Sequence, residues 1–392
     1  MGNKVCDRFP IKTMSLVMTE NCSLRCDYCF CGKKQSREID FKKAKKAVDW
    51  FLKPSVSDGK ANSMNFWGGE PMLKWDLIKK VVEYTKSKKE GLNFSLTTNG
   101  MHFDEKTIEE MVEYEVGALI SLDGGPESHN KHRKLPNGEG SYHIIEKNLK
   151  RYLKYRPNAN VRISLSKDNL KNFSNDLKHI YNLGFRNIFW SLVYEADWNH
   201  KDAKILKNEY YKIAEFYIKK VKEGDPFGVK MFRDGWREML YPNKNSYFCG
   251  AARTYVGVGV DLRIYPCHRF DDFENKQTAE KEEFCIGTIE KGITKPDIRK
   301  MFCDAMSPSY CKECKLFKVG FCHGGCYAAN YTWNKKDILY TIPIHCKETE
   351  ARFEILNYIY EKLKHTGYMK RKINRIHKRK GNAKNLGSIP CK

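Results

Sequence analysis

The chain has 392 residues, of which 41% are hydrophobic, so it can bury a sizeable core and we expect a globular protein of two units. It lacks both an apolar run long enough to span a membrane and a signal-peptide pattern, which predicts a cytoplasmic protein with no membrane partner. The formal net charge is +23, from 71 Lys and Arg against 48 Asp and Glu, which favours an anionic partner such as an acidic peptide or a nucleic acid.

Residues 13 to 223 alternate short β-branched or apolar runs with longer amphipathic, Lys-rich segments, which predicts repeated β–α units. We expect strands at residues 13–19, 62–67, 92–98, 117–123, 161–166 and 187–194. Parallel strands with right-handed crossovers can curl into a partial or complete barrel, with chemistry at the carboxyl ends of the strands. Polar clusters follow most of these strands, so we expect one mouth to collect them.

The second half of the chain has a different pattern. The β–α rhythm stops after residues 222–228, and the chain becomes cysteine-rich, so we place a domain boundary near residue 235. A helix is expected from about residue 348 to 364. Residues 362 to 384 hold ten Lys and Arg and no Asp or Glu, which predicts a solvated, mobile end. The expected domains are residues 1–235, 236–350 and 351–392.

Four of the fifteen cysteines lie close together after the first expected strand, in the stretch TENCSLRCDYCFCG. In a long chain without a signal peptide, clustered cysteines favour metal ligation over disulfides. Cys22, Cys26 and Cys29 can ligate three irons of a four-iron cluster and leave the fourth iron open. A zinc site with Cys31 as fourth ligand is the alternative, but Cys31 lies too close to Cys29 for both to reach one ion well.

The spacing Cys-x3-Cys-x-aromatic-Cys, with Tyr28 as the aromatic residue, resembles the radical S-adenosylmethionine (SAM) enzymes. The resemblance implies an α/β fold, a partial (β/α)6 barrel similar to a TIM barrel. It also implies that the methionine part of SAM chelates the open iron, and that one electron then breaks a sulfur–carbon bond of SAM. The resulting 5′-deoxyadenosyl radical would abstract hydrogen from a substrate that the protein positions away from water.

Further stretches resemble the SAM-binding motifs of the same enzymes. GGEP, which comprises Gly68, Gly69, Glu70 and Pro71, resembles the site for the amino group of SAM; glycines allow close backbone approach and a carboxylate pairs with an ammonium. SLDGGPESHNKHR resembles a maturase motif, with one extra glycine. The resemblance implies that Ser121, Asp123 and Arg133 contact SAM, and Asn99, at the end of a nearby strand, is a further candidate. As isolated residues, these side chains could equally cap the helices that follow.

The cysteines of the second half follow a longer pattern: Cys249, Cys267, Cys311, Cys314, Cys322, Cys326 and Cys346. A zinc ribbon with loose cysteines is the alternative, and beside a basic tail it would suggest a nucleic-acid-binding protein. Zinc ribbons pair two short hooks, however, and this pattern has three short steps with distant partners.

The pattern resembles the SPASM domain of peptide-modifying radical SAM enzymes, which binds two auxiliary iron–sulfur clusters. VDLRIYPCHRF and FCHGGCYAANY correspond to its signature stretches. The resemblance implies a first auxiliary cluster held by Cys249, Cys267 and Cys326, and a second held by Cys311, Cys314, Cys322 and Cys346. With the SAM-binding cluster, three [4Fe-4S] clusters are expected.

This sequence departs from the SPASM pattern at three points. Leu262 replaces a glycine of the family, and seven residues instead of five separate Cys314 from Cys322. The cysteine that sulfatase maturases have just after the first SPASM cysteine is missing, which leaves the first auxiliary cluster one thiolate short. Cys285, Cys303 and His268 are the candidate substitutes. An open iron that binds a substrate thiolate is the preferred interpretation.

The resemblance implies oxidation of a residue in a peptide or protein. One outcome is a thioether or carbon–carbon crosslink in a ribosomally made peptide, and the alternative is formylglycine formation in a sulfatase. Sulfatase maturases have Asp directly after the second SPASM cysteine, where this chain has His268, which disfavours formylglycine. His268 is therefore the candidate catalytic base, although a histidine beside a cluster can equally pack against it or donate a hydrogen bond.

Only 21 residues precede Cys22, so a leader-binding module at the N-terminus is not expected. The expected partners are a peptide substrate with an acidic leader, a separate leader-binding protein, and an electron donor such as flavodoxin or ferredoxin. Glu195, Asp197 and Trp198 follow the sixth expected strand and are candidates to face the substrate. An iron–sulfur or zinc protein that binds nucleic acid is the rival from another class.

Overall fold

The computed structural model describes residues 9–242, 249–271, 283–305, 309–334 and 337–379. The chain divides into two compact units, and each is described by itself. The first unit comprises Met1–Ser121, His129–Ala159 and Cys249–Ala305, and the second comprises Leu122–Ser128, Asn160–Phe248 and Met306–Lys392. The functional domain boundaries expected near residues 235 and 350 stay predictions.

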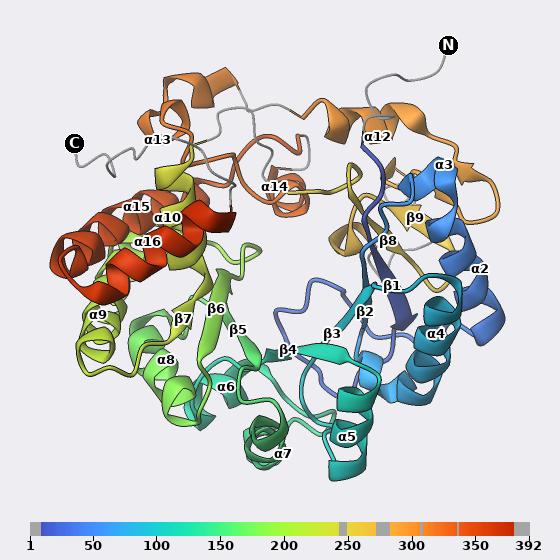
Figure 1. Cartoon of the computed structure of the whole chain (residues 1–392), viewed down its shortest axis with the longest axis horizontal. Helices are drawn as coiled ribbons and strands as arrows, with labels where there is room; N and C mark the ends of the chain where they lie inside the picture. Colours follow the sequence, from blue (N-terminus) through green and yellow to red (C-terminus); the bar gives the residue numbers. More distant parts are fainter. Residues whose placement is uncertain (1–8, 243–248, 272–282, 306–308, 335–336, 380–392) are drawn as a thin grey trace. The chain divides into compact units, whose positions relative to one another are not determined.

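A mixed sheet forms the centre of the first unit (Figure 1). Its strands lie in the order β11 (Gly292–Ile293), β10 (Gly287–Thr288), β9 (Arg263–Tyr265), β8 (Tyr255–Val258), β1 (Thr13–Thr19), β2 (Ser63–Gly68), β3 (Asn93–Thr98) and β4 (Val116–Ser121). Strands β8, β1, β2, β3 and β4 are parallel to their neighbours, whereas β8 to β11 pair antiparallel. The segment that contains Cys249 and Cys267 therefore belongs to the same unit as the first cysteine cluster.

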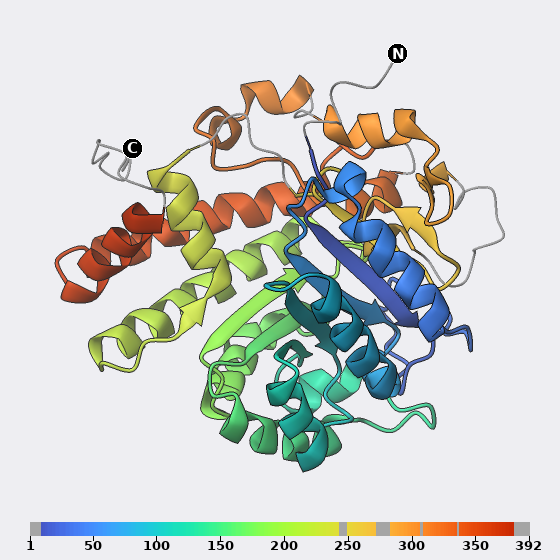
Figure 2. The ribbon, with the colours of Figure 1, turned by 45° about the vertical axis from the view of Figure 1, so that its right-hand side comes forward.

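The burial of the strands follows from their neighbours. In β2 and β3 every second residue is buried, as expected for strands with one face on the core. In β1 every residue after Thr13 is buried, because β2 and β8 pair with its two edges. Figure 2 shows β1 beside the helices α2 (Phe41–Leu52) and α4 (Trp75–Lys88). The loop that follows β1 thus leaves from the centre of a rigid sheet.

Helices of the first unit begin directly after the loops that carry polar residues. Besides α2 and α4 they are α3 (Pro54–Ser57), α5 (Glu105–Glu113), α7 (Tyr142–Tyr155) and α12 (Pro296–Cys303), with short 3-10 turns η1 (Pro71–Lys74) and η3 (His268–Phe270). The Asp40 carboxylate accepts a hydrogen bond from the Lys43 amide at the start of α2 (2.7 Å). Asp104 caps α5 in the same way, through the Thr107 amide (2.8 Å).

The second unit contains the parallel strands β5 (Asn160–Leu165), β6 (Asn187–Leu192) and β7 (Gly228–Val229). Its helices are α8 (Phe173–Asn182), α9 (His200–Lys222), α10 (Lys230–Leu240), α13 (Lys315–Lys318), α14 (Tyr327–Asn334), α15 (Pro343–Leu363) and α16 (Gly367–Arg379), with 3-10 turns η2 (Leu170–Asn172) and η4 (Ser309–Glu313). Helix α6 (Pro126–His132) has residues in both units. Within the second unit, α15 packs along α9 and α10 (Figure 1).

Part of the basic tail differs from the prediction of a mobile end. Residues 367–379 form helix α16, whose Met369 and Ile376 are buried. The Nζ of Lys372 donates a hydrogen bond to the Oη of Tyr217 on α9 (2.8 Å) and lies 4.5 Å from the ring centroid of Trp236 on α10. The apolar face of α16 therefore packs on α9 and α10 within the second unit. The residues of the tail beyond 379 lie outside the described part of the chain. Among the described residues, no helix combines the length and hydropathy needed to cross a lipid bilayer.

Candidate active site

The loop after β1 carries the three cysteines predicted to hold the SAM-binding cluster. Cys22, Cys26 and Cys29 are all half-buried, and the loop closes through a hydrogen bond from the Cys29 amide to the Cys26 carbonyl (3.2 Å). The Leu24 amide donates to the Sγ of Cys22 (3.4 Å), and the Nζ of Lys34 donates to the Sγ of Cys29 (2.8 Å). Three thiols with nearby hydrogen-bond donors on one tight loop fit a [4Fe-4S] cluster, whose thiolates accept such bonds.

Cys31 lies in a different environment from its neighbours, since its side chain is buried. A hydrogen bond to Cys29 raises the pKa of Cys31 well above its usual value, and burial raises it further. The same hydrogen bond, together with the charge of Lys34, lowers the pKa of Cys29 to about 5. Cys31 therefore contacts a predicted ligand, and its omission from the ligand set stays a prediction.

The loop that contains Gly68 and Gly69 is interlocked with the cysteine loop. The Gly69 amide donates to the Thr19 carbonyl (2.9 Å), and the Glu70 amide donates to the Asn21 carbonyl (2.9 Å). A Cβ on Gly68 would lie 2.1 Å from the Thr19 oxygen, and one on Gly69 would lie 2.1 Å from the Asn21 oxygen. The glycines thus allow two backbones to approach each other, whereas the sequence had suggested an approach to SAM.

Glu70 is buried, and both of its carboxylate oxygens accept hydrogen bonds from backbone amides. Oε1 accepts from Met72 (3.1 Å), in the turn that begins at Pro71, and Oε2 accepts from Asn99 (2.8 Å), just after β3. Burial raises the pKa of Glu70 to about 7, although these bonds oppose the shift. Glu70 therefore joins the loops after β2 and β3, and its pairing with the amino group of SAM remains a prediction.

Asn99 and Arg133 both lie against the cysteine loop. The Nδ2 of Asn99 donates to the Oγ of Ser23 (3.1 Å) and lies 3.8 Å from the Sγ of Cys22. The Arg133 guanidinium stacks over the ring of Tyr28, 5.5 Å from its centroid. The structure thus gathers the predicted SAM contacts of the first unit around one loop.

Ser121 is the last residue of β4, and Asp123 lies in the second unit, whose first segment begins at Leu122. The carboxylate of Asp123 is buried and accepts a hydrogen bond from the Ser164 amide in β5 (2.9 Å). The extra glycine of this motif, Gly124, has φ +137°, and a Cβ there would meet the Asp176 side chain. Within the second unit these residues support the backbone, and the SAM contacts expected of Ser121 and Asp123 stay predictions.

Cys249 and Cys267 flank strand β8 in the first unit. Burial raises the pKa of Tyr255 on this strand, and the neighbouring thiols of Cys267 and Cys249 raise it further, so both lie near its hydroxyl. The hydroxyl of Tyr255 also forms a hydrogen bond with the Nδ1 of His268. Cys326, the third predicted ligand of the first auxiliary cluster, belongs to the second unit. Its grouping with Cys249 and Cys267 remains a prediction.

His268 packs against aromatic residues of the first unit. Its ring centroid lies 4.3 Å from that of Trp67 on β2 and 6.2 Å from that of Phe30 in the cysteine loop. Cys285, considered as a substitute ligand, donates from Sγ to the Gly287 carbonyl (3.3 Å), and Cys303 is fully buried at the end of α12. The role of His268 as a base stays a prediction.

The four cysteines predicted to hold the second auxiliary cluster lie together in the second unit. Burial, together with the thiols of Cys322, Cys311 and Cys314, raises the pKa of Cys346 to about 12. Burial likewise raises the pKa of Cys311 to about 11, with contributions from Cys322 and Cys314. Mutual effects of this kind require proximity.

Single-ion sites and clusters place different demands on these thiols. Among the described residues, no three His, Cys, Asp or Glu side chains are arranged to hold one metal ion. The thiolates of a cubane bind separate irons and need not converge on one point. That the grouped thiols of the second unit hold a cluster stays a prediction.

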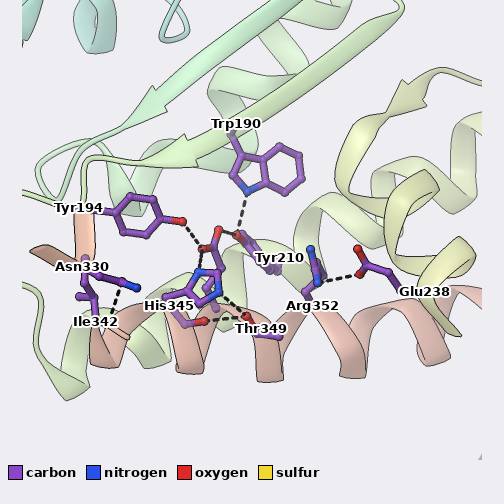
Figure 3. Close-up of polar contacts among 10 residues, drawn as sticks. Trp190, Tyr194, Tyr210, Glu238, Asn330, Ile342, His345, Thr349 and Arg352 are labelled. Atoms are coloured by element: carbon purple, nitrogen blue, oxygen red, sulfur yellow. Dashed lines mark hydrogen bonds and ion pairs between the residues drawn. The ribbon is translucent and has the colours of Figure 1, made fainter. Parts of the chain in front are cut away.

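A buried polar network surrounds helix α15, which also carries Cys346 (Figure 3). The Oη atoms of Tyr210 and Tyr194 donate to the carboxylate of Glu348, at 2.8 and 3.1 Å. The Nε1 of Trp190 on β6 donates in turn to the Oη of Tyr210 (2.8 Å). Burial raises the pKa of Glu348, while these hydrogen bonds oppose the shift. The network fixes α15, and so Cys346, against β6 and α9.

Two departures from the SPASM pattern have a visible structural result. Leu262, at the position of a family glycine, has φ 64°, a left-handed conformation that glycine adopts without strain. Its side chain is buried, which offsets part of that strain. The residues between Cys314 and Cys322 include the short helix α13, which accommodates the longer gap.

Sequence reasoning missed Lys34, His102 and Glu348. Lys34, five residues after Cys29, was recognisable as a cation near a predicted cluster. The Nε2 of His102 lies 3.3 Å from the Oγ of Ser23, and Glu348 bonds residues more than 130 positions away. No local signal marks such partners, because the fold alone brings them together.

Comparison with known proteins agrees with this arrangement. Residues 16–180 match the family model of the Radical SAM superfamily. A cysteine-type anaerobic sulfatase-maturating enzyme of Clostridium novyi is 24% identical over 347 residues, which cover 81% of this chain and 88% of that enzyme. An uncharacterized protein of Methanocaldococcus jannaschii is 29% identical over 185 residues, 47% of this chain and 63% of that protein. The chain thus spans less than two thirds of this second relative.

Two solved structures share the fold. Native anSMEcpe with bound AdoMet and Cp18Cys peptide has a TM-score of 0.70 at 22% identity, covering 93% of this chain and 99% of that chain. Streptococcus suis SuiB bound to precursor peptide SuiA has a TM-score of 0.59 at 16% identity, covering 86% and 76%. These likenesses confirm the expected α/β fold and extend through the C-terminal half. Residues 16–180 of this chain therefore carry a radical SAM domain.

Proposed function

We propose that this protein is a peptide maturase that uses SAM and a [4Fe-4S] cluster to oxidise a residue in a ribosomally made peptide. The observation that carries the proposal is the interlocked pair of loops after β1 and β2, in which the amides of Gly69 and Glu70 bind the carbonyls of Thr19 and Asn21 just before the three cysteines. When bound, the cluster and SAM supply a 5′-deoxyadenosyl radical, which takes a hydrogen atom from the substrate.

The chain's own residues bind and orient the cofactor. Cys22, Cys26 and Cys29 hold the cluster, and Lys34 balances the charge of the Cys29 thiolate. The Gly68–Gly69 backbone fixes the cysteine loop, while Arg133, which stacks on Tyr28, would contact the carboxylate of SAM. The burial of Glu70 and Asn99 keeps this side of the loop dry, which protects a reactive radical from water.

We further propose that the chain holds two auxiliary clusters, which would supply an acceptor for the electron that the substrate loses as the new bond forms. The grouped thiols of Cys311, Cys314, Cys322 and Cys346 support the second cluster. The first would take Cys249, Cys267 and Cys326 and would have one open iron for a substrate thiolate. Anaerobic Mössbauer spectra with and without peptide test the open iron, because four thiolate ligands in both states would contradict it.

A thioether or carbon–carbon crosslink is the product that the chain's residues favour. His268 follows Cys267 and packs on Trp67, where the sulfatase maturases have an Asp. Formylglycine formation is the second candidate, because the C. novyi relative is a sulfatase-maturating enzyme and matches 81% of this chain. Tandem mass spectrometry of small peptides co-expressed with the enzyme separates the two: a crosslink removes about two hydrogens and joins two residues, whereas formylglycine formation leaves an aldehyde on a single residue.

The first test of the proposal is anaerobic SAM cleavage with dithionite as reductant. The iron-loaded protein is expected to form 5′-deoxyadenosine, and a Cys26→Ala variant is expected to lose that activity while it keeps the iron of the auxiliary sites. Cys285→Ala, which replaces a buried cysteine hydrogen-bonded to the Gly287 carbonyl, is the control and should retain cleavage. A nucleic-acid-binding protein would instead bind DNA or RNA in a salt-dependent way and leave SAM intact.

A further inference from the structure

A groove runs over the outside of the first unit, beside the cysteine loop. One part has a volume of about 630 Å³ and lies between η1, α4 and the start of α5. A second part, of about 340 Å³, shares Met72, Trp75, Asp104 and Thr107 with the first and is also lined by Met101 and His102. A third part, of about 660 Å³, continues from Arg151 along α7. We call these three parts together the η1–α7 groove.

The η1–α7 groove reaches the cysteine loop through two side chains. His102 lines the groove, and its Nε2 lies 3.3 Å from the Oγ of Ser23, the residue after Cys22. The same Oγ accepts a hydrogen bond from the Nδ2 of Asn99, which lies 3.8 Å from the Sγ of Cys22. A short chain of hydrogen-bonded groups thus connects the surface of the groove with a predicted ligand of the SAM-binding cluster.

The rim of the η1–α7 groove is basic. Exposed lysines line it at positions 80, 106, 147 and 154, and none of these four forms an ion pair with any described residue. Of its acidic residues, Asp76 and Glu110 pair with Lys79 and Glu146 pairs with Lys150. Asp104, which caps α5, and Glu105, which accepts a hydrogen bond from Tyr155, form no ion pair with a described residue, so two anions face the four unpaired lysines. The uncompensated charge on the rim is therefore positive.

Apolar side chains lie on the same surface. Phe41 and Leu73 line the first part of the groove and are each 37% exposed. Small apolar centres with a charged rim suit transient complexes, in which charge steers the encounter and a limited contact area allows fast release. Electron-transfer complexes between proteins are of this kind.

We propose that the η1–α7 groove is the docking surface for an acidic one-electron carrier protein that reduces the SAM-binding cluster. The inference rests on the proposed function, because reductive cleavage of SAM consumes one electron that must come from outside the chain. In the step itself the reduced carrier loses one electron and the oxidised cluster gains it. That electron then passes to SAM, whose sulfur–carbon bond breaks to give methionine and the 5′-deoxyadenosyl radical.

The test compares a protein carrier with a small reductant. The probe is an acidic flavodoxin in its hydroquinone form, and dithionite, which needs no docking surface, is the reference. A Lys106→Glu/Lys147→Glu variant is expected to bind the flavodoxin at least about tenfold more weakly, because two cations of the rim become anions. Binding is measured by biolayer interferometry on the iron-loaded protein, and cluster reduction is followed by absorbance without SAM.

The matched control is a Lys370→Glu/Lys378→Glu variant on the exposed face of α16, which makes the same change in net charge in the other unit. The proposal expects the control to retain flavodoxin affinity and flavodoxin-driven reduction within about twofold. Dithionite-driven reduction should be unchanged in both variants. Equal losses of affinity in the two variants, or none in the groove variant, would overturn the docking surface.

A second variant separates docking from electron transfer. His102→Leu removes the imidazole at the floor of the groove and leaves the lysines of the rim in place. It is expected to keep the affinity for flavodoxin and to slow flavodoxin-driven cluster reduction at least about fivefold, whereas an unchanged rate would rule out the route through His102. If the unmodified protein did not cleave SAM with dithionite, that result would instead contradict the proposed function.

Discussion

At Gly69 two loops lie so close together that no side chain fits between them. An ideal Cβ would lie 2.1 Å from the Asn21 carbonyl oxygen, and both contacting groups belong to the backbone, so neither can rotate away. We therefore expect Gly69→Ala to lower the free energy of unfolding by about 1–3 kcal/mol and to weaken iron retention in the cysteine loop. Anaerobic urea unfolding and iron analysis provide the measurements.

The matched control for Gly69→Ala is Gly117→Ala in strand β4. A Cβ at Gly117 has its closest neighbour, the Phe94 carbonyl oxygen, at an ordinary contact distance of 3.7 Å. This variant is expected to retain iron and stability. If the two alanine variants behaved alike, steric exclusion at Gly69 would not explain the glycine.

Glu70 predicts a pH dependence with a defined sign. Burial raises its pKa from 4.5 to about 7, so between these values the folded protein holds a proton that the unfolded chain releases. The stabilising contribution is therefore complete below about pH 4.5 and is lost as the pH rises towards about 7. Relative to a Glu70→Gln variant, the wild-type protein should lose about 3 kcal/mol of stability across this range.

Urea unfolding of wild type and Glu70→Gln at intervals between pH 4.5 and 8 measures this difference. Other carboxylates titrate in both proteins, and their contributions cancel. A stability difference that stays constant with pH would show that the Glu70 carboxyl has a similar pKa in the folded and unfolded chain. If wild type instead gained stability relative to Glu70→Gln as the pH rises, the predicted sign would be wrong.

At the scale of elements, helix α16 depends on a buried amine. Burial, together with the charges of Arg233 and Arg375, lowers the pKa of Lys372 to about 7. The folded protein therefore lacks a proton that the unfolded chain holds between about pH 7 and the usual lysine pKa, so wild-type stability should rise with pH in this range.

A Lys372→Met variant keeps an unbranched apolar side chain of similar length and should lose this pH dependence, with α16 at least as stable at pH 7 as in wild type. The hydroxyls of Tyr217 and Tyr368 still have each other as partners, at 2.7 Å. Hydrogen exchange of the α16 amides at pH 7 and 9, corrected for intrinsic rates, measures the effect. Parallel pH profiles in the two proteins would contradict it.

Strands and helices were predictable from the sequence to different degrees. All six expected strands are present within a few residues of their predicted ends, because short β-branched or apolar runs between amphipathic segments are a strong local signal for strands. Helix α16 was not predicted, because a run of Lys and Arg without acids resembles a solvated tail. Its stability comes from contacts with Tyr217 and Trp236, which lie more than 130 residues earlier.

The candidate site divides in the same way. The cysteine pattern singled out Cys311, Cys314, Cys322 and Cys346, and their thiols lie together in the second unit although Cys346 stands on helix α15; that they hold a cluster stays a prediction. The partners of these groups were not predictable. Glu70 was expected to face SAM, yet its oxygens bind the amides of Met72 and Asn99, a contact that exists only once β2 and β3 are paired.

At the scale of the whole molecule, the net charge of +23 predicts salt-dependent binding of acidic peptides. We expect a glutamate-rich peptide to bind about tenfold more weakly when the salt concentration rises from about 50 to about 300 mM. Fluorescence anisotropy with labelled peptide measures the affinity, and the same peptide with Gln in place of Glu is the control.

Helix α15 limits how freely this enzyme could be redesigned. Cys346 and Glu348 stand on the same turn, Glu348 binds Tyr194 just after β6, and Arg352 pairs with Glu238 on α10 (3.0 Å). A chimera that exchanged residues 187–194 for those of another maturase would remove the Tyr194 hydroxyl and leave a buried carboxylate with one donor fewer. Residues 187–194 and helix α15 therefore depend on each other, and a variant with a new specificity requires that both be exchanged together.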